Sequence, residues 1–122
     1  MPEDFRVEEQ HPSGANATVL ALHGEVDLHV APELRDRLNG ALEADARNLV
    51  IDLSRVSFID SMALGALLEL HKRLRAEGGE LRLVVPDTKL RRIFEITLLD
   101  QIFTLAKTRH EALAAFTSSW GS

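Results

Sequence analysis

The sequence predicts an α/β fold: a mixed sheet of four to five strands covered by about four helices. Two strand-like segments, 5–9 and 18–23, open the chain. The connection between them is short and rich in turn formers, which predicts an antiparallel hairpin. Strand-like and helix-like segments then alternate to the end of the chain, which favours a sheet covered by helices. The periodicity leaves the order of the strands open.

The first helix follows a polar break at 24–28. Pro32 stands near its first position, where the missing N–H costs nothing. The buried face of this helix consists of apolar residues at helical spacing: Leu34, Leu38, Ala41 and Leu42. The segment 44–48 ends the helix.

The central unit of the chain is a strand, a turn and a helix. Residues 49–53 form a short apolar run typical of a buried strand, and residues 54–59 form a polar turn. Residues 62–74 form the helix, which is apolar nearly all round in its first two turns. Such a helix has more apolar surface than one core-facing stripe needs, which favours a partner on one side.

Ser61 lies at or beside the N-cap of this central helix, next to Asp60. Both residue types are strong N-caps, so one interpretation is a purely structural cap. The other interpretation is a functional hydroxyl, because free backbone N–H groups and the positive end of the helix dipole converge there. The residues alone leave both interpretations open.

The last third of the chain continues the alternation. Gly78 and Gly79 end the central helix, and a strand follows at 81–85. Asp87 or Thr88 caps the next helix. The buried face of that helix consists of Leu90, Ile93 and Phe94. A loop and a short last strand follow within 98–105. A capping box at 108–111 begins the final helix, which has Leu113 and Phe116 on its inward side.

The composition indicates one domain, 1–122, with a core from about 5 to 116 and a tail at 117–122. The net charge of −5 argues against direct nucleic-acid binding, and no apolar run is long enough for membrane insertion. The acidic start lacks the layout of a signal peptide. The absence of cysteine excludes disulfides and thiol chemistry. We therefore expect a cytoplasmic protein.

Three segments share their order and spacing with a known family: Gly24–Asp27 followed by Ala31–Leu34, then Val50–Leu53, then Phe58–Gly65. They resemble the STAS domain and, more narrowly, the bacterial anti-sigma-factor antagonists. The resemblance extends from Phe5 to about Phe116. It implies a STAS-like single domain that is a binding regulator and no enzyme.

The resemblance also implies a phosphorylation switch at Ser61. In that family the matching serine is phosphorylated by a partner that is both a serine kinase and an anti-sigma factor. The unphosphorylated antagonist binds this partner and frees a sigma factor, and phosphorylation breaks the complex. A serine phosphatase is expected to reverse the modification. The partner-binding residues implied here are Asp27, Asp60, Ser61, Met62, Leu64 and Gly65.

The chain departs from the family pattern at two places. Met62 and Ala63 stand where the family often has a hydroxyl residue and a glycine, which leaves Ser61 as the one expected phosphorylation site of this motif. A common hydroxyl or amide after the residue matching Asp27 is also missing, and residues 28–30 are Leu-His-Val. These departures bear on the identity of the partner more than on the fold.

Other chemistry has little support in the sequence. The five histidines are scattered without metal-ligand spacing, and His71 is expected to be an exposed or boundary helix residue. The residues around Ser61 do not form the Gly-x-Ser-x-Gly motif of serine hydrolases, and no Walker-type loop is present. We therefore expect no catalytic residue, metal or cofactor.

Two alternative functions remain besides the switch. A STAS accessory subunit would dock constitutively to a membrane transport ATPase through the same surface. A more distant alternative is an enzyme with Ser61 as nucleophile and a histidine from elsewhere. Six basic residues also occur on the central helix and the helix after it: Lys72, Arg73, Arg75, Lys89, Arg91 and Arg92. They could form a docking patch, but solvated helix surfaces explain them more simply.

Overall fold

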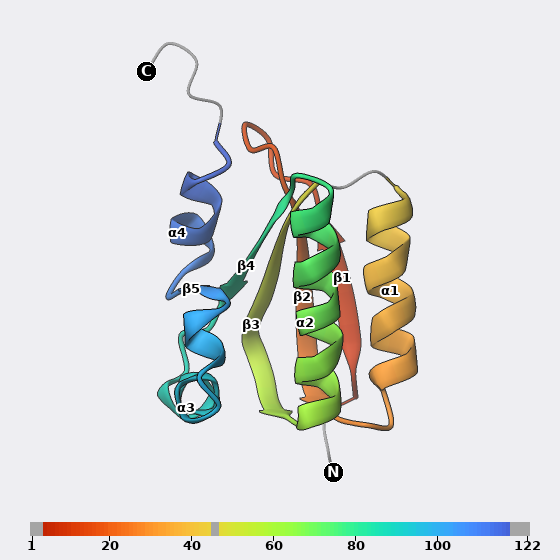
Figure 1. The fold of residues 1–122 in the computed structure, drawn as a ribbon, viewed down its shortest axis with the longest axis vertical. Helices are drawn as coiled ribbons and strands as arrows, with labels where there is room; N and C mark the ends of the chain where they lie inside the picture. Colours follow the sequence, from red (N-terminus) through yellow and green to blue (C-terminus); the bar gives the residue numbers. More distant parts are fainter. Residues whose placement is uncertain (1–3, 45–46, 118–122) are drawn as a thin grey trace.

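The computed structural model describes residues 4–44 and 47–117 of the chain (Figure 1). Its elements are β1 (Arg6–Gln10), β2 (Thr18–Val26), α1 (Ala31–Glu43), β3 (Asn48–Ile59), α2 (Ser61–Ala76), β4 (Glu80–Val84), α3 (Thr88–Ile96), the 3-10 helix η1 (Leu99–Gln101), β5 (Thr104–Ala106) and α4 (Arg109–Ala114).

The strands form one mixed five-stranded sheet in the order β1-β2-β3-β4-β5. β1 and β2 form the predicted antiparallel hairpin, with Arg6 opposite His23. The other neighbouring pairs are parallel, and α1, α2 and α3 connect them. The predicted α/β class with a mixed sheet covered by helices is confirmed.

Helices cover the two faces of the sheet unequally. The helices α1, α2 and α3 lie on one face, where leucines, isoleucines and phenylalanines from these helices and from the strands form the main core (Figure 1). Burial of this apolar surface is the main stabilising term of the fold. The shorter α4 covers part of the other face, where Val19, Val50, Val84, Ala112 and Phe116 form a second, smaller cluster. The predicted inward positions of Leu113 and Phe116 agree, since Leu113 is half-buried against this cluster and Phe116 is buried.

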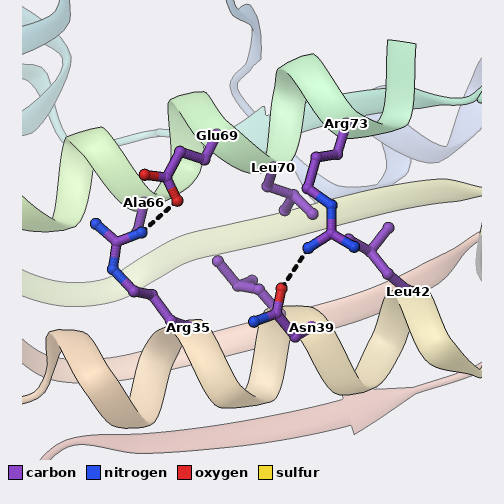
Figure 2. Close-up of a pocket in the computed structure, with 8 residues that line it drawn as sticks. Arg35, Asn39, Leu42, Ala66, Glu69, Leu70 and Arg73 are labelled. Carbon is purple, nitrogen blue, oxygen red and sulfur yellow. Dashed lines mark hydrogen bonds and ion pairs between the residues drawn. The ribbon is translucent and has the colours of Figure 1, made fainter. Parts of the chain in front are cut away.

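Two polar bridges join α1 and α2 across a groove (Figure 2). Arg35 forms an ion pair with Glu69, and Arg73 donates a hydrogen bond to Asn39 at 2.6 Å. The floor of the groove is apolar, and its volume is about 50 Å³. Drug-sized ligands and cofactors occupy pockets of about 300–1,000 Å³, so this groove is too small for one. We infer that the bridges hold the two helices in register.

The predicted turn at 54–59 is wrong, because β3 continues as a strand to Ile59. The predicted polar break at 24–28 is wrong over its first three residues for the same reason, since β2 extends to Val26. The pairing of β2 with β3 shifts register twice, between Ala21 and His23 and between Gly24 and Glu25. Such bulges interrupt the alternation of inward and outward side chains, so the sequence no longer shows the period of two.

The helix caps follow the predicted chemistry. The carboxylate of Asp87 accepts the N–H of Lys89 at 2.8 Å, which makes Asp87 the N-cap of α3. The hydroxyl of Thr108 accepts the N–H of Glu111 at 3.0 Å at the start of α4. Thr117 pairs with Ala15 in an isolated bridge, and the rest of the predicted tail lies outside the described residues. Within the described ranges, the helices lack the combination of length and apolar character that crossing a membrane requires.

Candidate functional site

Ser61 lies at the edge of the sheet where the parallel strands β2 and β3 have their carboxyl ends. The helices α1 and α2 begin at this same edge, at the lower end of the view in Figure 1. The N–H of Asp60 donates to the carbonyl of Val26 at 3.2 Å, which joins the ends of the two strands. Ligand and partner sites of α/β sheets form at this kind of edge.

Asp60 is the N-cap of α2. One carboxylate oxygen, Oδ1, accepts the N–H groups of Met62 and Ala63 at 3.0 and 3.1 Å. The other oxygen, Oδ2, accepts the N–H of Leu28 at 2.9 Å. The sequence left the cap open between Asp60 and Ser61, and the structure assigns it to Asp60. Ser61 is therefore the first residue of the helix, with its side chain free of the capping role.

Ser61 is exposed at this position. Its hydroxyl forms no hydrogen bond to any residue within the described ranges. The side chain is therefore accessible from solvent while the helix stays folded. The N–H groups that would otherwise bind an added phosphate, those of Met62 and Ala63, are already occupied by Asp60. A phosphate on Ser61 would stand in water beside a carboxylate.

Asp27 lies on the loop between β2 and α1. Its Oδ1 accepts the N–H of His29 at 2.9 Å, and its carbonyl accepts the N–H of Val30 at 3.1 Å. Asp27 therefore shapes this loop, while Asp60 binds the same loop at Leu28. The two carboxylates that the family resemblance places near Ser61 thus belong to one hydrogen-bonded unit.

Exposed apolar side chains surround Ser61. Met62 is 50% exposed, Leu28 is 58% exposed and Phe58 is 46% exposed. Met62, which the resemblance assigns to the partner surface, is therefore accessible to a partner. The expectation for Leu64 needs correction: it is only 7% exposed and packs in the core, so its side chain offers little contact surface.

Gly65 is half-buried in α2, one turn beyond Ser61. A Cβ atom built at Gly65 would have no neighbour within 4 Å in this chain. Glycine costs a helix about 1 kcal/mol relative to alanine. Packing within the chain therefore gives no reason for the missing side chain.

The residues near Ser61 lack the arrangement of a nucleophilic enzyme. A nucleophilic serine needs a base within hydrogen-bond reach. In residues 4–44 and 47–117 no histidine ring bonds to Ser61, and the ring of His29 faces Asp27 at 3.5 Å instead. No group of three or more potential metal ligands occurs in the described part of the chain either.

Comparison with known proteins agrees with this geometry. Residues 6–112 match the family described as the STAS domain. The chain belongs to the STAS domain family. It is 37% identical to the anti-sigma-B factor antagonist of Bacillus subtilis over 83 residues, which cover 68% of this chain and 75% of that relative.

Solved structures give the same result for this STAS domain. The crystal structure of an anti-sigma factor antagonist from Mycobacterium paratuberculosis superimposes with a TM-score of 0.79 and 31% identity, covering 93% of this chain and 94% of that one. The Bacillus cell fate determinant SpoIIAA in its phosphorylated form superimposes with a TM-score of 0.68 and 25% identity, covering 90% and 98% of the two chains.

The structure of this STAS domain also contains an ion pair that we did not predict, on the face of the sheet away from α2. Asp52 is buried in β3, and its Oδ2 accepts two hydrogen bonds from Arg109 of α4, at 3.0 and 2.8 Å. Burial raises the pKa of Asp52, but hydrogen bonds from Ser54 and the charge of Arg109 outweigh it, and the pKa is lowered. An aspartate inside an apolar strand was the signal for this pair.

Proposed function

We propose that this chain is an anti-sigma factor antagonist whose binding is switched by phosphorylation of Ser61. The unphosphorylated chain binds an anti-sigma factor that is also a serine kinase, and it thereby releases a sigma factor. The observation that carries the proposal is the exposed position of Ser61 at the start of α2, next to the exposed Met62 and to Asp60, which binds the loop of the exposed Leu28. The family and its relatives support it.

The partner surface in this proposal consists of the edge around Ser61. Met62 and Leu28 supply apolar area, and Gly65 lets a partner backbone come close to α2. Asp60 and Asp27 hold the loop between β2 and α1 and the start of α2 in place. Leu64 contributes from beneath, by fixing α2 to the core.

Phosphorylation would act through charge. A phosphoserine carries about −1.5 to −2 charges at pH 7. In the free chain this charge stays exposed to water, so the fold tolerates it. In the complex it would be confined against the partner and beside Asp60, whose carboxylate already occupies the N–H groups of Met62 and Ala63. One like-charge contact at about 4 Å with an effective dielectric near 20 costs about 4 kcal/mol, close to a thousandfold in affinity.

The chain acts in this proposal as a kinase substrate and a binding protein, with no enzymatic activity of its own. A serine phosphatase restores the binding form. The partner kinase binds the ATP. We therefore expect the switch to operate in the cytoplasm.

Phosphorylation followed by mass spectrometry tests the proposal. The purified chain is incubated with candidate anti-sigma factor kinases of the same organism and Mg-ATP, and intact masses and peptides are measured. We expect one phosphoryl group, located on Ser61, and none on the Ser61→Ala variant. Phosphate on Ser57 or Thr88 at the same rate would contradict it. Binding without any phosphorylation would favour constitutive docking, as in a subunit of a transport ATPase.

A further inference from the structure

The exposed large hydrophobic side chains of the described residues form two groups. Leu28, Phe58 and Met62 lie at the edge that carries Ser61. The other group lies on the segment 96–102, which runs from the last residue of α3 through η1 and which we name the α3–η1 turn. Its exposed members are Ile96, Leu98 and Ile102. The phosphorylation switch does not use this second group.

Leu98 adopts a backbone conformation that a leucine does not favour. Its φ of 62° and ψ of 15° are left-handed, and within the described ranges no other non-glycine residue has a positive φ. It follows Thr97, the C-cap of α3, at the position where helices usually have glycine or asparagine. The left-handed conformation strains a side chain with a Cβ atom.

Hydrogen bonds on both sides hold this conformation. The N–H of Leu98 donates to the carbonyl of Glu95 at 3.1 Å, and its carbonyl accepts the N–H of Gln101 at 3.1 Å. The side chain is 66% exposed, so burial does not offset the strain. Glycine would therefore serve the fold at least as well. Contacts within the described residues give no reason for a leucine at this position, and retained strain of this kind occurs at binding sites.

Positive charge lies next to this turn. Lys89, Arg92 and Ile96 have the spacing of one exposed ridge of α3. Neither cation forms an ion pair within the part of the chain that the structure describes. The acidic residues nearby in sequence are Glu95 on the same helix and Asp100 in the turn itself. The chain as a whole has a net charge of −5, so this basic ridge departs from its surroundings. A complementary surface is an apolar pocket with carboxylates at its rim.

The α3–η1 turn lies on the same side of the sheet as α2 (Figure 1). Phe103, directly after the turn, packs edge-to-face on His71 of α2, with ring centroids 5.7 Å apart. On α2, the half-exposed residues Gly65 and Leu68 continue from Ser61 along one ridge. The ridge continues to His71, three residues after Leu68, and Phe103, which follows the turn, packs against that residue.

We propose that the α3–η1 turn is a second contact for the protein that Ser61 controls, with Leu98 inserted into an apolar, acid-rimmed pocket of that protein. This inference rests on the proposed function. The contact sets affinity and partner choice, and the phosphate on Ser61 does the switching.

Titration calorimetry with a purified anti-sigma factor kinase of the same organism tests this contact. The parent is the unmodified chain, and every titration is done without nucleotide, so that no chain becomes phosphorylated. We expect Leu98→Gly and Leu98→Asn to weaken binding by about tenfold or more, as loss of one buried leucine contact does. Both variants should melt no lower than the parent, because glycine and asparagine accept the left-handed conformation. Leu98→Met keeps an apolar side chain at equal strain and should bind within about threefold of the parent.

The outcomes separate the two proposals. If the parent chain binds and Leu98→Gly keeps the parent affinity, the second contact is wrong and the switch at Ser61 stands. If the parent chain binds none of the kinases, both proposals fail. Loss of affinity in Leu98→Met as large as that in Leu98→Gly contradicts an apolar pocket. Leu98-dependent binding to phosphatidylglycerol vesicles, with no effect on the kinase, contradicts a protein partner.

Discussion

The backbone N–H of Leu28 donates to Oδ2 of Asp60 at 2.9 Å, which links the loop before α1 to the start of α2. The other oxygen of the same carboxylate accepts the N–H groups of Met62 and Ala63. One side chain thus satisfies three backbone donors from two segments of the chain. Asp60 therefore ties the backbone of Leu28 to the backbone of Met62 at the start of α2.

Removing this carboxylate should destabilise the fold. We expect Asp60→Ala to lower the free energy of unfolding by about 1–2 kcal/mol, because three N–H groups lose their acceptor. Asp87→Ala is the matched control, since Asp87 caps α3 through one N–H group and should cost less. Urea unfolding of both variants measures the difference. Equal losses would contradict the linking role of Asp60.

Met62 should matter for binding and little for folding. It is 50% exposed, so Met62→Lys should change the free energy of unfolding by at most about 0.5 kcal/mol. The same variant should bind the anti-sigma factor at least tenfold more weakly, because a charged side chain replaces apolar contact area. Leu64→Lys is the contrasting variant and should unfold the domain, because Leu64 is buried. Wild-type affinity of Met62→Lys would remove Met62 from the partner surface.

Gly65 and Gly40 form a matched pair for testing close approach. Both are helical, and a Cβ atom at either would meet nothing within 4 Å of this chain. Each glycine-to-alanine change should therefore raise the free energy of unfolding by up to about 1 kcal/mol. Only Gly65→Ala should weaken binding to the partner. If calorimetry shows the same affinity for both variants, the partner does not approach α2 at Gly65.

The ion pair of Asp52 and Arg109 should make stability depend on acid. The pKa of Asp52 is lowered in the folded chain, because the hydrogen bonds from Ser54 and the charge of Arg109 outweigh burial. Its contribution is therefore present above the unfolded pKa of about 3.9 and is lost as the pH falls through the folded value. Asp52→Asn should cost about 1–2 kcal/mol at pH 7, since Arg109 remains partly in water.

Urea unfolding at pH 7, 4 and 3 measures this acid dependence. The difference between wild type and Asp52→Asn should shrink as the pH falls. Asp36→Asn, at an exposed position of α1, is the control and should stay close to wild type throughout. A difference between wild type and Asp52→Asn that stays constant from pH 7 to pH 3 would contradict an ionised role for Asp52.

The sequence predicted the parts of the fold that depend on neighbouring residues. The hairpin, the helices and the caps at Asp87 and Thr108 follow from local turn and capping chemistry, and they are confirmed. The second half of β3 could not be predicted from local sequence. Its two register shifts depend on pairing with β2, and the resulting pattern, with Val56 and Ile59 buried, resembles neither a strand nor a helix in sequence.

The candidate site was predicted in position but not in detail. Local sequence cannot decide between Asp60 and Ser61 as the cap, because the decision depends on Leu28, which is distant in sequence and near in space. The burial of Leu64 depends in the same way on packing against the sheet. Leu98 gave no signal at all, because nothing in a leucine indicates a left-handed backbone.

The most direct test of the switch is the affinity of the phosphorylated chain for its anti-sigma factor. The chain is phosphorylated on Ser61, purified, and titrated against the partner by calorimetry beside the unmodified chain, Ser61→Ala and Ser61→Asp. Thermal melts of each free chain accompany the titrations. Because Asp60 is the cap, the variants should melt close to wild type. We predict that Ser61→Ala binds like the unmodified chain, Ser61→Asp binds more weakly, and the phosphorylated chain binds on the order of a thousandfold more weakly. Equal affinity of the phosphorylated and unmodified chains would contradict the switch.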